Sequence, residues 1–195
     1  MDKMSSVILA GGKGKRMGFL DKGLLRIKND SFIDIIYRNL SFTNETIIVT
    51  NSKENYNFKK YKLYEDIVSG KGPLGGIYTG LEYSSNEKVL FIPCDMPSVK
   101  KRTLELISNI AFNEDALVVV NRNQIQPLIG IYRKSINSVI YEMIETSNEV
   151  NGNLSIRNLL SRISVKYIYL NHETNEFINI NTPDIYKNLK NLQII

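Results

Sequence analysis

Short segments that are apolar on both faces recur along the chain, and stretches with helical spacing separate them. The predicted strands of the first two thirds are Ser6–Ala10, Thr46–Thr50, Lys62–Tyr64, Val89–Pro93 and Ala116–Val120. The predicted helices between them are Ser31–Phe42, a weaker Ser52–Phe58, Leu74–Tyr83 and Lys101–Ala111. Strands buried on both faces and separated by helices indicate a parallel sheet between two layers of helices. We therefore expect a three-layer α/β fold with a doubly wound, mostly parallel sheet.

The last third of the chain has a less regular pattern. It predicts two strands and two helices, at Leu128–Tyr132, Val165–Leu170, Ser135–Glu145 and Leu154–Ser161. A short segment, Phe177–Ile180, precedes a final helix that begins at Pro183 and continues to about Leu192, with Asn181 or Thr182 as its cap. No repeat or linker-like run interrupts the pattern, so residues 1–195 are predicted to form one domain.

The composition is that of a globular protein. Hydrophobic residues make up 43% of the 195 residues and charged residues 23%, which argues against intrinsic disorder, collagen and coiled coil. No apolar run has the length of a membrane helix or of a signal-peptide core, and the single cysteine, Cys94, forms no internal disulfide, so we expect a cytoplasmic protein. The net charge of +5 is spread along the chain without an Arg-rich helix, which argues against a nucleic-acid partner.

A glycine-rich loop, Leu9–Gly18, directly follows the first predicted strand, where phosphate-binding loops lie in α/β sheets. It is not a Walker A loop, because position 9 is not glycine and position 16 is neither Ser nor Thr, and Met17 replaces the third glycine of a dinucleotide-binding loop. What remains is a longer nucleotide loop, in which glycine N–H groups approach phosphates and cations neutralise them. These residues are Gly11, Gly12, Gly14, Arg16 and Lys22. A flexible turn with solvated lysines is the alternative.

The run from Leu9 to Leu25 reads Leu-Ala-Gly-Gly-x-x-x-Arg-Met-Gly-x-x-Asp-Lys-x-Leu-Leu. It resembles the signature of the molybdenum cofactor guanylyltransferases, the MobA family, within the wider nucleotidyltransferase superfamily. Further segments of the family pattern follow in order: Glu65-Asp66, Gly72-Pro73-Leu74-Gly75-Gly76, Pro93-Cys94-Asp95-Met96-Pro97, Gln126-Pro127-Leu128 and Asn179-Ile180-Asn181-Thr182-Pro183. The resemblance implies a Rossmann-like fold of the nucleotide-diphospho-sugar transferase type. One departure is Gln126, where relatives often carry histidine.

Asp95 follows a buried strand and lies between two prolines, so its carboxylate is expected opposite the phosphate loop, where it is suited to hold Mg²⁺. An aspartate that only stabilises the turn is the alternative. Asn179 and Asn181 flank Ile180 and are expected on one face of the chain. The resemblance implies that Asn181 helps to hold the metal and that both asparagines contact a pterin substrate. Helix capping is the alternative for either side chain.

The resemblance also implies the remaining roles. Asp66 would contact the guanosine, with a solvated loop carboxylate as the alternative. The implied catalytic residues are Arg16, Lys22 and Asp95. The implied nucleotide contacts are Leu9, Ala10, Gly11, Gly12, Gly14, Lys22, Asp66 and Asp95.

The reaction implied by the resemblance is the transfer of GMP from GTP to the terminal phosphate of molybdenum-molybdopterin, with Mg²⁺ as cofactor and pyrophosphate as product. Because the attacking phosphate is already ionised, this chemistry needs no histidine or cysteine. The only histidine, His172, is expected at the surface and Cys94 in the core. The expected partners are GTP, molybdopterin, and carrier or apo-molybdoenzyme proteins, without nucleic acid or membrane. The alternatives are a cytidylyltransferase, a sugar-phosphate nucleotidyltransferase and a non-catalytic nucleotide-binding accessory protein.

Overall fold

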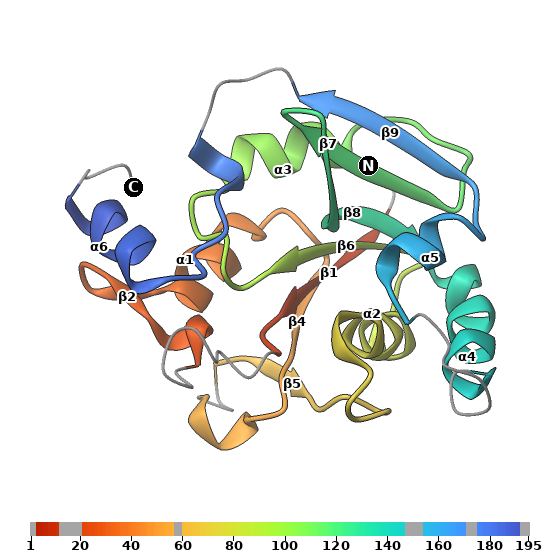
Figure 1. The fold of residues 1–195 in the computed structure, drawn as a ribbon, viewed down its shortest axis with the longest axis horizontal. Helices are drawn as coiled ribbons and strands as arrows, with labels where there is room; N and C mark the ends of the chain where they lie inside the picture. Colours follow the sequence, from red (N-terminus) through yellow and green to blue (C-terminus); the bar gives the residue numbers. More distant parts are fainter. Residues whose placement is uncertain (1–2, 12–20, 57–59, 147–153, 171–174, 192–195) are drawn as a thin grey trace.

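The computed structural model describes residues 3–11, 21–56, 60–146, 154–170 and 175–191 (Figure 1). Their centre is a seven-stranded sheet with the order β5-β4-β1-β6-β8-β7-β9. The strands are β1 (Met4–Leu9), β4 (Glu45–Val49), β5 (Lys62–Tyr64), β6 (Lys88–Pro93), β7 (Ala116–Asn121), β8 (Gln124–Arg133) and β9 (Val165–Leu170). Strands β5, β4, β1 and β6 are parallel, β8 is antiparallel to both neighbours, and β9 is parallel to β7. The mostly parallel sheet predicted from the sequence is confirmed.

Helices cover both faces of this sheet (Figure 1). Alternation along β1 sends Ile8 into one core and Val7 into the other, because successive side chains of a strand point to opposite faces. Helices α1 and α3 pack on the Ile8 side, and α2, α4 and α5 pack on the Val7 side. Their bounds are α1 (Phe32–Asn39), α2 (Gly72–Tyr83), α3 (Lys101–Ser108), α4 (Asn137–Thr146) and α5 (Ile156–Leu160). The three layers expected from the sequence are thus present.

A small third core joins a hairpin, α1 and the last helix. The hairpin consists of β2 (Arg26–Ile27) and β3 (Asp30–Ser31), and the last helix is α6 (Pro183–Asn191). Ile27, Phe32 and Ile180 are buried together, and the Tyr186 ring meets Phe32 edge-on at 5.9 Å. The C-terminal segment is therefore fixed against the part of the chain that follows the glycine-rich loop.

One predicted helix differs from the structure. The predicted helix Ser52–Phe58 contains only a short 3₁₀ turn, η3 (Lys53–Asn55), in its described part, which ends at residue 56. No side chain caps this turn and none of its three residues is buried, so packing does not support a longer helix. The short segment Phe177–Ile180 lies at the end of a 3₁₀ turn, η5 (Asn175–Phe177), and then continues irregularly to α6.

Two hairpins have turns that could not be predicted from their sequences. Strand β8 begins at Gln124 rather than near Leu128, because a two-residue turn at Arg122 and Asn123 joins it to β7. Both turn residues have positive φ, 49° and 59°, which a type I′ hairpin requires. The unpredicted β2–β3 hairpin turns at Lys28, whose φ is 54°. Neither turn has the Asn-Gly or Asp-Gly sequence that usually marks such a turn.

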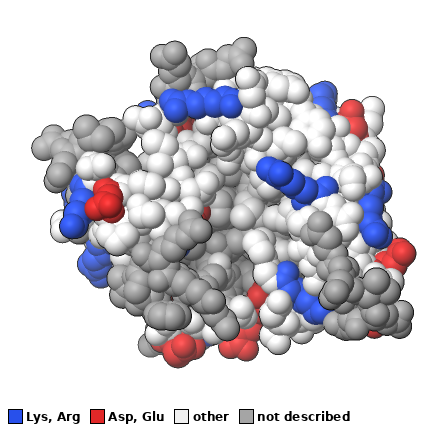
Figure 2. All heavy atoms as spheres, viewed as in Figure 1, with Lys and Arg blue, Asp and Glu red and all other residues white. Residues whose placement is uncertain are grey.

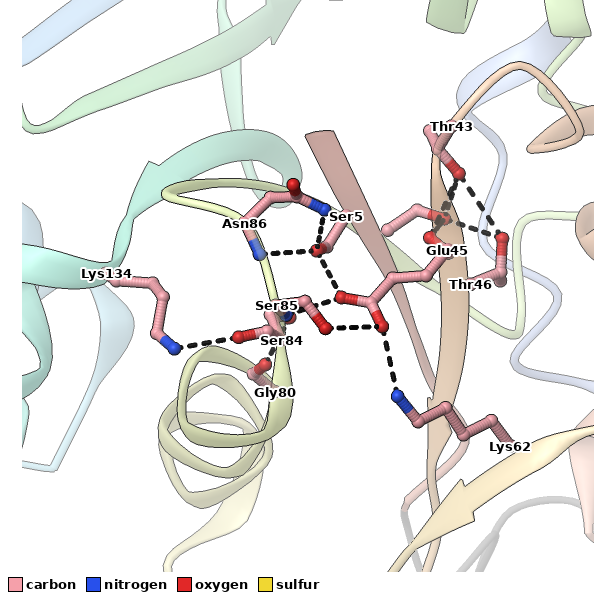
Figure 3. A network of polar contacts seen from close by, with 11 residues as sticks. Ser5, Thr43, Glu45, Thr46, Lys62, Gly80, Ser84, Ser85, Asn86 and Lys134 are labelled. Atoms are coloured by element: carbon pink, nitrogen blue, oxygen red, sulfur yellow. Dashed lines mark hydrogen bonds and ion pairs between the residues drawn. The ribbon is translucent and has the colours of Figure 1, made fainter. Parts of the chain in front are cut away.

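The amino ends of the parallel strands are joined by a polar cluster, which we call the Glu45 network: Ser5, Glu45, Lys62, Ser85 and Asn86 (Figure 3). The Glu45 carboxylate accepts hydrogen bonds from the Ser5 hydroxyl at 2.6 Å, Lys62 Nζ at 3.0 Å and both the N–H and the hydroxyl of Ser85. The N–H and the side-chain amide of Asn86 donate to the Ser5 hydroxyl oxygen. Burial alone would raise the pKa of Glu45, but these donors lower it to about 2. The carboxylate is thus held in its charged form between β1, β4 and the end of α2.

Candidate active site

The carboxyl ends of β1, β4 and β6 continue in register beyond the strands. The Ala10 N–H donates to the Val49 carbonyl at 2.8 Å, and the Cys94 N–H donates to the Leu9 carbonyl at 3.0 Å. These bonds place Leu9 beside the turn that carries Asp95 and Ala10 beside the end of β4, as expected for a ligand site at the carboxyl edge of a parallel sheet, and Gly11 follows as an exposed residue. The predicted loop residues Gly12, Gly14 and Arg16 lie outside the described residues.

Three predicted site residues from distant parts of the sequence meet at this edge. Lys22 begins a 3₁₀ turn, η2 (Lys22–Leu24), and its Nζ donates to Asp95 Oδ2 at 3.0 Å and to Asn181 Oδ1. The Lys22 and Asp95 side chains are 20% and 16% exposed, so this ion pair is largely shielded from solvent. A cation, a carboxylate and an amide oxygen therefore share one small volume.

The Asp95 turn is tied to the C-terminal segment, and one of its carboxylate oxygens has no described hydrogen-bond partner. The Ile180 N–H donates to the Asp95 carbonyl at 2.9 Å, which ties the C-terminal segment to the turn. In the described part of the chain, Asp95 Oδ1 is buried without a hydrogen-bond partner. Buried carboxylate oxygens are normally paired, and an orphaned one is suited to a cation. This favours a binding role for Asp95 over turn stabilisation alone.

The capping alternative for Asn181 is not supported. Thr182 Oγ1, rather than Asn181, accepts from the Ile185 N–H at the start of α6, at 3.4 Å. The Asn181 amide oxygen instead accepts from Lys22. Asn179 is half-buried two residues away, beside the fully buried Ile180. The structure thus brings Asn181 to the Lys22–Asp95 pair, whereas no described contact joins Asn179 to it.

Asp66 lies further along the same edge, after β5. Its Oδ2 accepts from the Asn51 side-chain amide at 2.8 Å, and its own N–H donates to Asn51 Oδ1 at 3.3 Å. Burial raises the pKa of the Asp66 carboxyl, against the lowering effect of Asn51. Asp66 is therefore a fixed, half-buried acceptor rather than a freely solvated carboxylate.

Helix α2 has a glycine, Gly76, where it passes close to Leu9 and Asp66. A Cβ at Gly76 would lie 3.0 Å from Leu9 Cδ2 and 3.7 Å from Asp66 Oδ1. The Ile67 N–H donates to Thr79 Oγ1 at 2.9 Å, which anchors the loop after Asp66 to the same helix. Helix α2 therefore packs closely against both the first strand and the Asp66 loop.

The sequence reasoning missed Asn51, the partner of Asp66. Asn51 follows β4 at the carboxyl edge, so the positional rule that selects Asp95 would also have selected Asn51. Of the other polar candidates, Gln126 is half-buried in β8 and pairs with Val119, and His172 lies outside the described residues. Cys94 is 7% exposed, and burial raises the pKa of its thiol, which confirms it as a core residue.

The Lys and Arg side chains on the face seen in Figure 2 lie singly rather than in one band. A cavity of about 450 Å³ lies away from the strand ends, between the β2–β3 hairpin, α1 and the start of α3, and none of the predicted site residues lines it.

In the part of the chain that the structure describes, no helix is long and apolar enough to cross a membrane.

Comparison with known proteins identifies the family. The family description "MobA-like NTP transferase domain" matches residues 6–164. The chain belongs to this family. The family resemblance stated from the Leu9–Leu25 signature is thereby confirmed.

Relatives within the family match the chain along nearly its whole length. A probable molybdenum cofactor guanylyltransferase of Clostridium perfringens is 34% identical over 192 residues, covering 97% of each chain. One of Flavobacterium johnsoniae with the same name is 35% identical over 187 residues, covering 94% of this chain and 95% of the relative.

Solved structures support the fold class. A molybdopterin-guanine dinucleotide biosynthesis protein A of Archaeoglobus fulgidus superposes with a TM-score of 0.80 at 24% identity, covering 97% of this chain and 98% of the other. A CMP:2-keto-3-deoxy-manno-octonic acid synthetase superposes with a TM-score of 0.73 at 12% identity, covering 98% of each chain. The predicted fold of the nucleotide-diphospho-sugar transferase type is confirmed.

Proposed function

We propose that this protein is a nucleotidyltransferase that transfers GMP from GTP to the terminal phosphate of molybdenum-molybdopterin. An oxygen of the pterin phosphate bonds to the α-phosphorus of GTP, the bond from that phosphorus to the bridging oxygen breaks, and pyrophosphate leaves with that oxygen. The observation that carries the proposal is the meeting of Lys22, Asp95 and Asn181 at the carboxyl edge of the sheet. The names of the full-length relatives supply the choice of guanine and pterin substrate.

Phosphate recognition falls to Lys22 and to the chain that follows β1. The N–H groups after Leu9, together with Gly12, Gly14 and Arg16, would bind the triphosphate, and the Lys22 ammonium would neutralise charge on it. Lys22 already contacts one carboxylate, so a phosphate near Asp95 would lie within reach of the same ammonium. Fixed cations of this kind stabilise a leaving pyrophosphate without any proton transfer.

The residues at this edge fit a divalent cation. Mg²⁺ in nucleotide sites is bound by one or two carboxylates together with phosphate oxygens and water, so the orphaned Asp95 Oδ1 and the Asn181 amide oxygen are a suitable donor set. The described residues contain no group of three or more His, Cys, Asp or Glu side chains, and a phosphate-assisted site needs none. When bound, Mg²⁺ would neutralise the phosphates and hold them in line for transfer.

The remaining polar residues are assigned to the two ends of the substrate pair. Asp66, held by Asn51, would accept hydrogen bonds from the guanosine. Asn179 and Asn181, beside the Asp95 turn, would contact the pterin. The attacking phosphate is ionised at neutral pH, so the residues at this edge position and neutralise groups and need not remove a proton.

The same proposal extends to the setting of the reaction. Residues 1–195 would work as one nucleotidyltransferase domain in the cytoplasm, with GTP and molybdopterin as substrates. Molybdenum-cofactor carriers or apo-molybdoenzymes would supply the substrate or receive the product. The net charge of +5 suits anionic substrates.

Pyrophosphate release tests the proposal. Purified protein with Mg²⁺ and molybdenum-molybdopterin should release pyrophosphate from GTP roughly a hundredfold faster than from CTP, and omission of the pterin should stop release. Faster release from CTP would identify a cytidylyltransferase, and release that needs a sugar phosphate would identify a sugar-phosphate enzyme. Binding of GTP without any release would identify an accessory protein.

A further inference from the structure

Lys22 is held by a short turn whose first side chain is an aspartate. Asp21 caps η2, and its Oδ1 accepts from the Gly23 N–H at 3.1 Å. The Leu24 N–H donates to the Asp21 carbonyl at 3.1 Å. The backbone on both sides of Lys22 therefore depends on the position of Asp21.

A tyrosine from a different loop fixes that aspartate. Tyr56 follows η3, beyond the end of β4, and is 5% exposed. Its hydroxyl donates to Asp21 Oδ1 at 2.7 Å across 35 residues of sequence. One carboxylate oxygen thus accepts from both the turn that carries Lys22 and the loop after β4.

Gly23, which has no side chain, leaves room for the contact between Tyr56 and Asp21. A Cβ at Gly23 would lie 2.6 Å from the Tyr56 hydroxyl oxygen and 2.8 Å from Ile33 Cγ1. Gly23 is buried, so a side chain there would have to displace one of these groups. In the segment Asp21-Lys22-Gly23, the aspartate holds the turn, the lysine reaches Asp95 and the glycine admits the tyrosine.

Because both groups are at least half-buried, loss of the hydrogen bond between Tyr56 and Asp21 would be destabilising. Burial raises the pKa of the Asp21 carboxyl, against the lowering effects of Tyr56 and of the Gly23 N–H. Burial and the hydrogen bond to Asp21 also raise the pKa of the Tyr56 phenol, so the hydroxyl keeps its proton and donates. A half-buried carboxylate that loses a donor shifts to regain one.

We propose that Tyr56 is a positioning residue for Lys22 and acts through the Asp21 carboxylate. The chain of contacts runs from the Tyr56 hydroxyl to Asp21, through the turn to Lys22, and on to Asp95 and Asn181. Tyr56 contacts no predicted substrate-binding residue directly in the described hydrogen bonds. The role in catalysis rests on the proposed function, whereas the effect on Lys22 does not.

Replacement of Tyr56 by phenylalanine tests the proposal. Y56F keeps the ring and removes the hydroxyl, and it should lower kcat/KM for GTP about tenfold to a hundredfold, the size expected when a charged group shifts by a fraction of an ångström to one ångström. The matched control is Y61F, because the Tyr61 hydroxyl donates to the Asp34 carboxylate at 2.6 Å, away from the site. Y61F should leave kcat/KM within twofold of wild type. Wild-type kinetics in Y56F would overturn the proposal.

A double-mutant cycle separates positioning from a general structural role. In a K22M background, Y56F should lower kcat/KM by less than twofold, because the group that Tyr56 positions is already gone. Independent, multiplicative effects of the two substitutions would overturn the proposal. D21N, which keeps an acceptor oxygen for both donors, should retain most of the activity that D21A loses. Equal losses in D21N and D21A would overturn it in favour of a direct role for the carboxylate charge.

A spectroscopic measurement keeps the inference separate from the reaction. The side-chain ammonium resonance of Lys22 in ¹⁵N-labelled protein should be protected from exchange in wild type and Y61F, and broadened or lost in Y56F. If wild-type protein releases no pyrophosphate from GTP, the proposed function fails, but this resonance still decides the positioning role. An unchanged Lys22 resonance in folded Y56F would overturn that role.

Discussion

The carboxylates at the two ends of the parallel sheet are largely buried but differ in their hydrogen bonding. At the amino end, both oxygens of Glu45 are fully engaged by donors from three elements (Figure 3). At the carboxyl end, Asp95 has one oxygen bonded to Lys22 and one buried oxygen without a described partner. A polar network in which every group is hydrogen-bonded adds stability, whereas an unpaired buried acceptor is available to bind a ligand. The contrast separates the part of the sheet that holds the fold from the part that is available for chemistry.

The largest expected effect is at Asp95. D95N keeps the shape of the side chain and removes its charge, so pyrophosphate release from GTP should fall about a hundredfold to a thousandfold. The melting temperature should stay within a few degrees of wild type, because the amide oxygen of the D95N side chain can still accept the hydrogen bond from Lys22. Retained turnover in a folded D95N protein would remove Asp95 from the site. Steady-state kinetics and a thermal melt on the same preparation decide this.

The next effect is at Glu45, where we expect stability to fall and catalysis to be retained, the opposite of the expectation for Asp95. E45Q places an amide N–H₂ group among donors, so the free energy of unfolding should fall by about 1–3 kcal/mol. Kinetic constants of the folded variant should stay within twofold of wild type. Urea unfolding followed by circular dichroism measures the first quantity, and pyrophosphate release measures the second. Lost turnover without lost stability would break the division between the two ends of the sheet.

The pH dependence sharpens the assignment of Glu45. Its pKa falls from 4.5 to about 2 in the folded chain, so its stabilising contribution is complete above about pH 4.5 and is lost as the pH falls toward 2. The amide side chain in E45Q does not titrate, so the difference in unfolding free energy between wild type and E45Q should narrow over this window. A difference that stays constant from pH 5 to pH 2 would contradict this role for the Glu45 charge.

The smallest expected effect concerns the metal. Without nucleotide, the Lys22 ammonium occupies the space between the two oxygen groups proposed to hold Mg²⁺, and like charges repel. K22M should therefore bind Mn²⁺ about threefold to tenfold more tightly than wild type when no nucleotide is present. K62M removes an ammonium from the Glu45 network and should leave Mn²⁺ binding unchanged. Titration followed by the electron paramagnetic resonance of free Mn²⁺ measures both, and weaker binding by K22M would argue against shared occupancy.

The sequence predicts the parallel half of the fold well, because the carboxyl halves of β1, β4 and β6 are apolar runs buried on both faces. It misses the two hairpins, whose turns at Lys28 and Arg122 place ordinary side chains at positive φ under the control of tertiary packing. The short helix predicted at Ser52–Phe58 was wrong for a related reason, since spacing alone does not supply a surface to pack against.

The candidate site divides in a similar way. Asp95 and Asp66 follow strands of the parallel sheet, so their place at the carboxyl edge can be predicted from the chain. The meeting of Lys22 with Asn181 depends on how the last segment packs against the β2–β3 hairpin, which no local pattern encodes. Tyr56 was missed because one tyrosine in a mostly polar stretch gives no pattern of its own, and only its hydroxyl contact with Asp21 distinguishes it.

The long separation between Lys22 and Asn181 has a consequence for synthesis. The four parallel strands that present Leu9, Val49, Tyr64 and Pro93 are complete once residue 93 has been made, and they can pair as the chain emerges. Asn181, which lies 159 positions after Lys22 in the sequence, is translated much later than these strands. While the chain between Pro93 and Asn181 is being made, the nascent protein therefore has the strands that carry the site but not the last group that completes it.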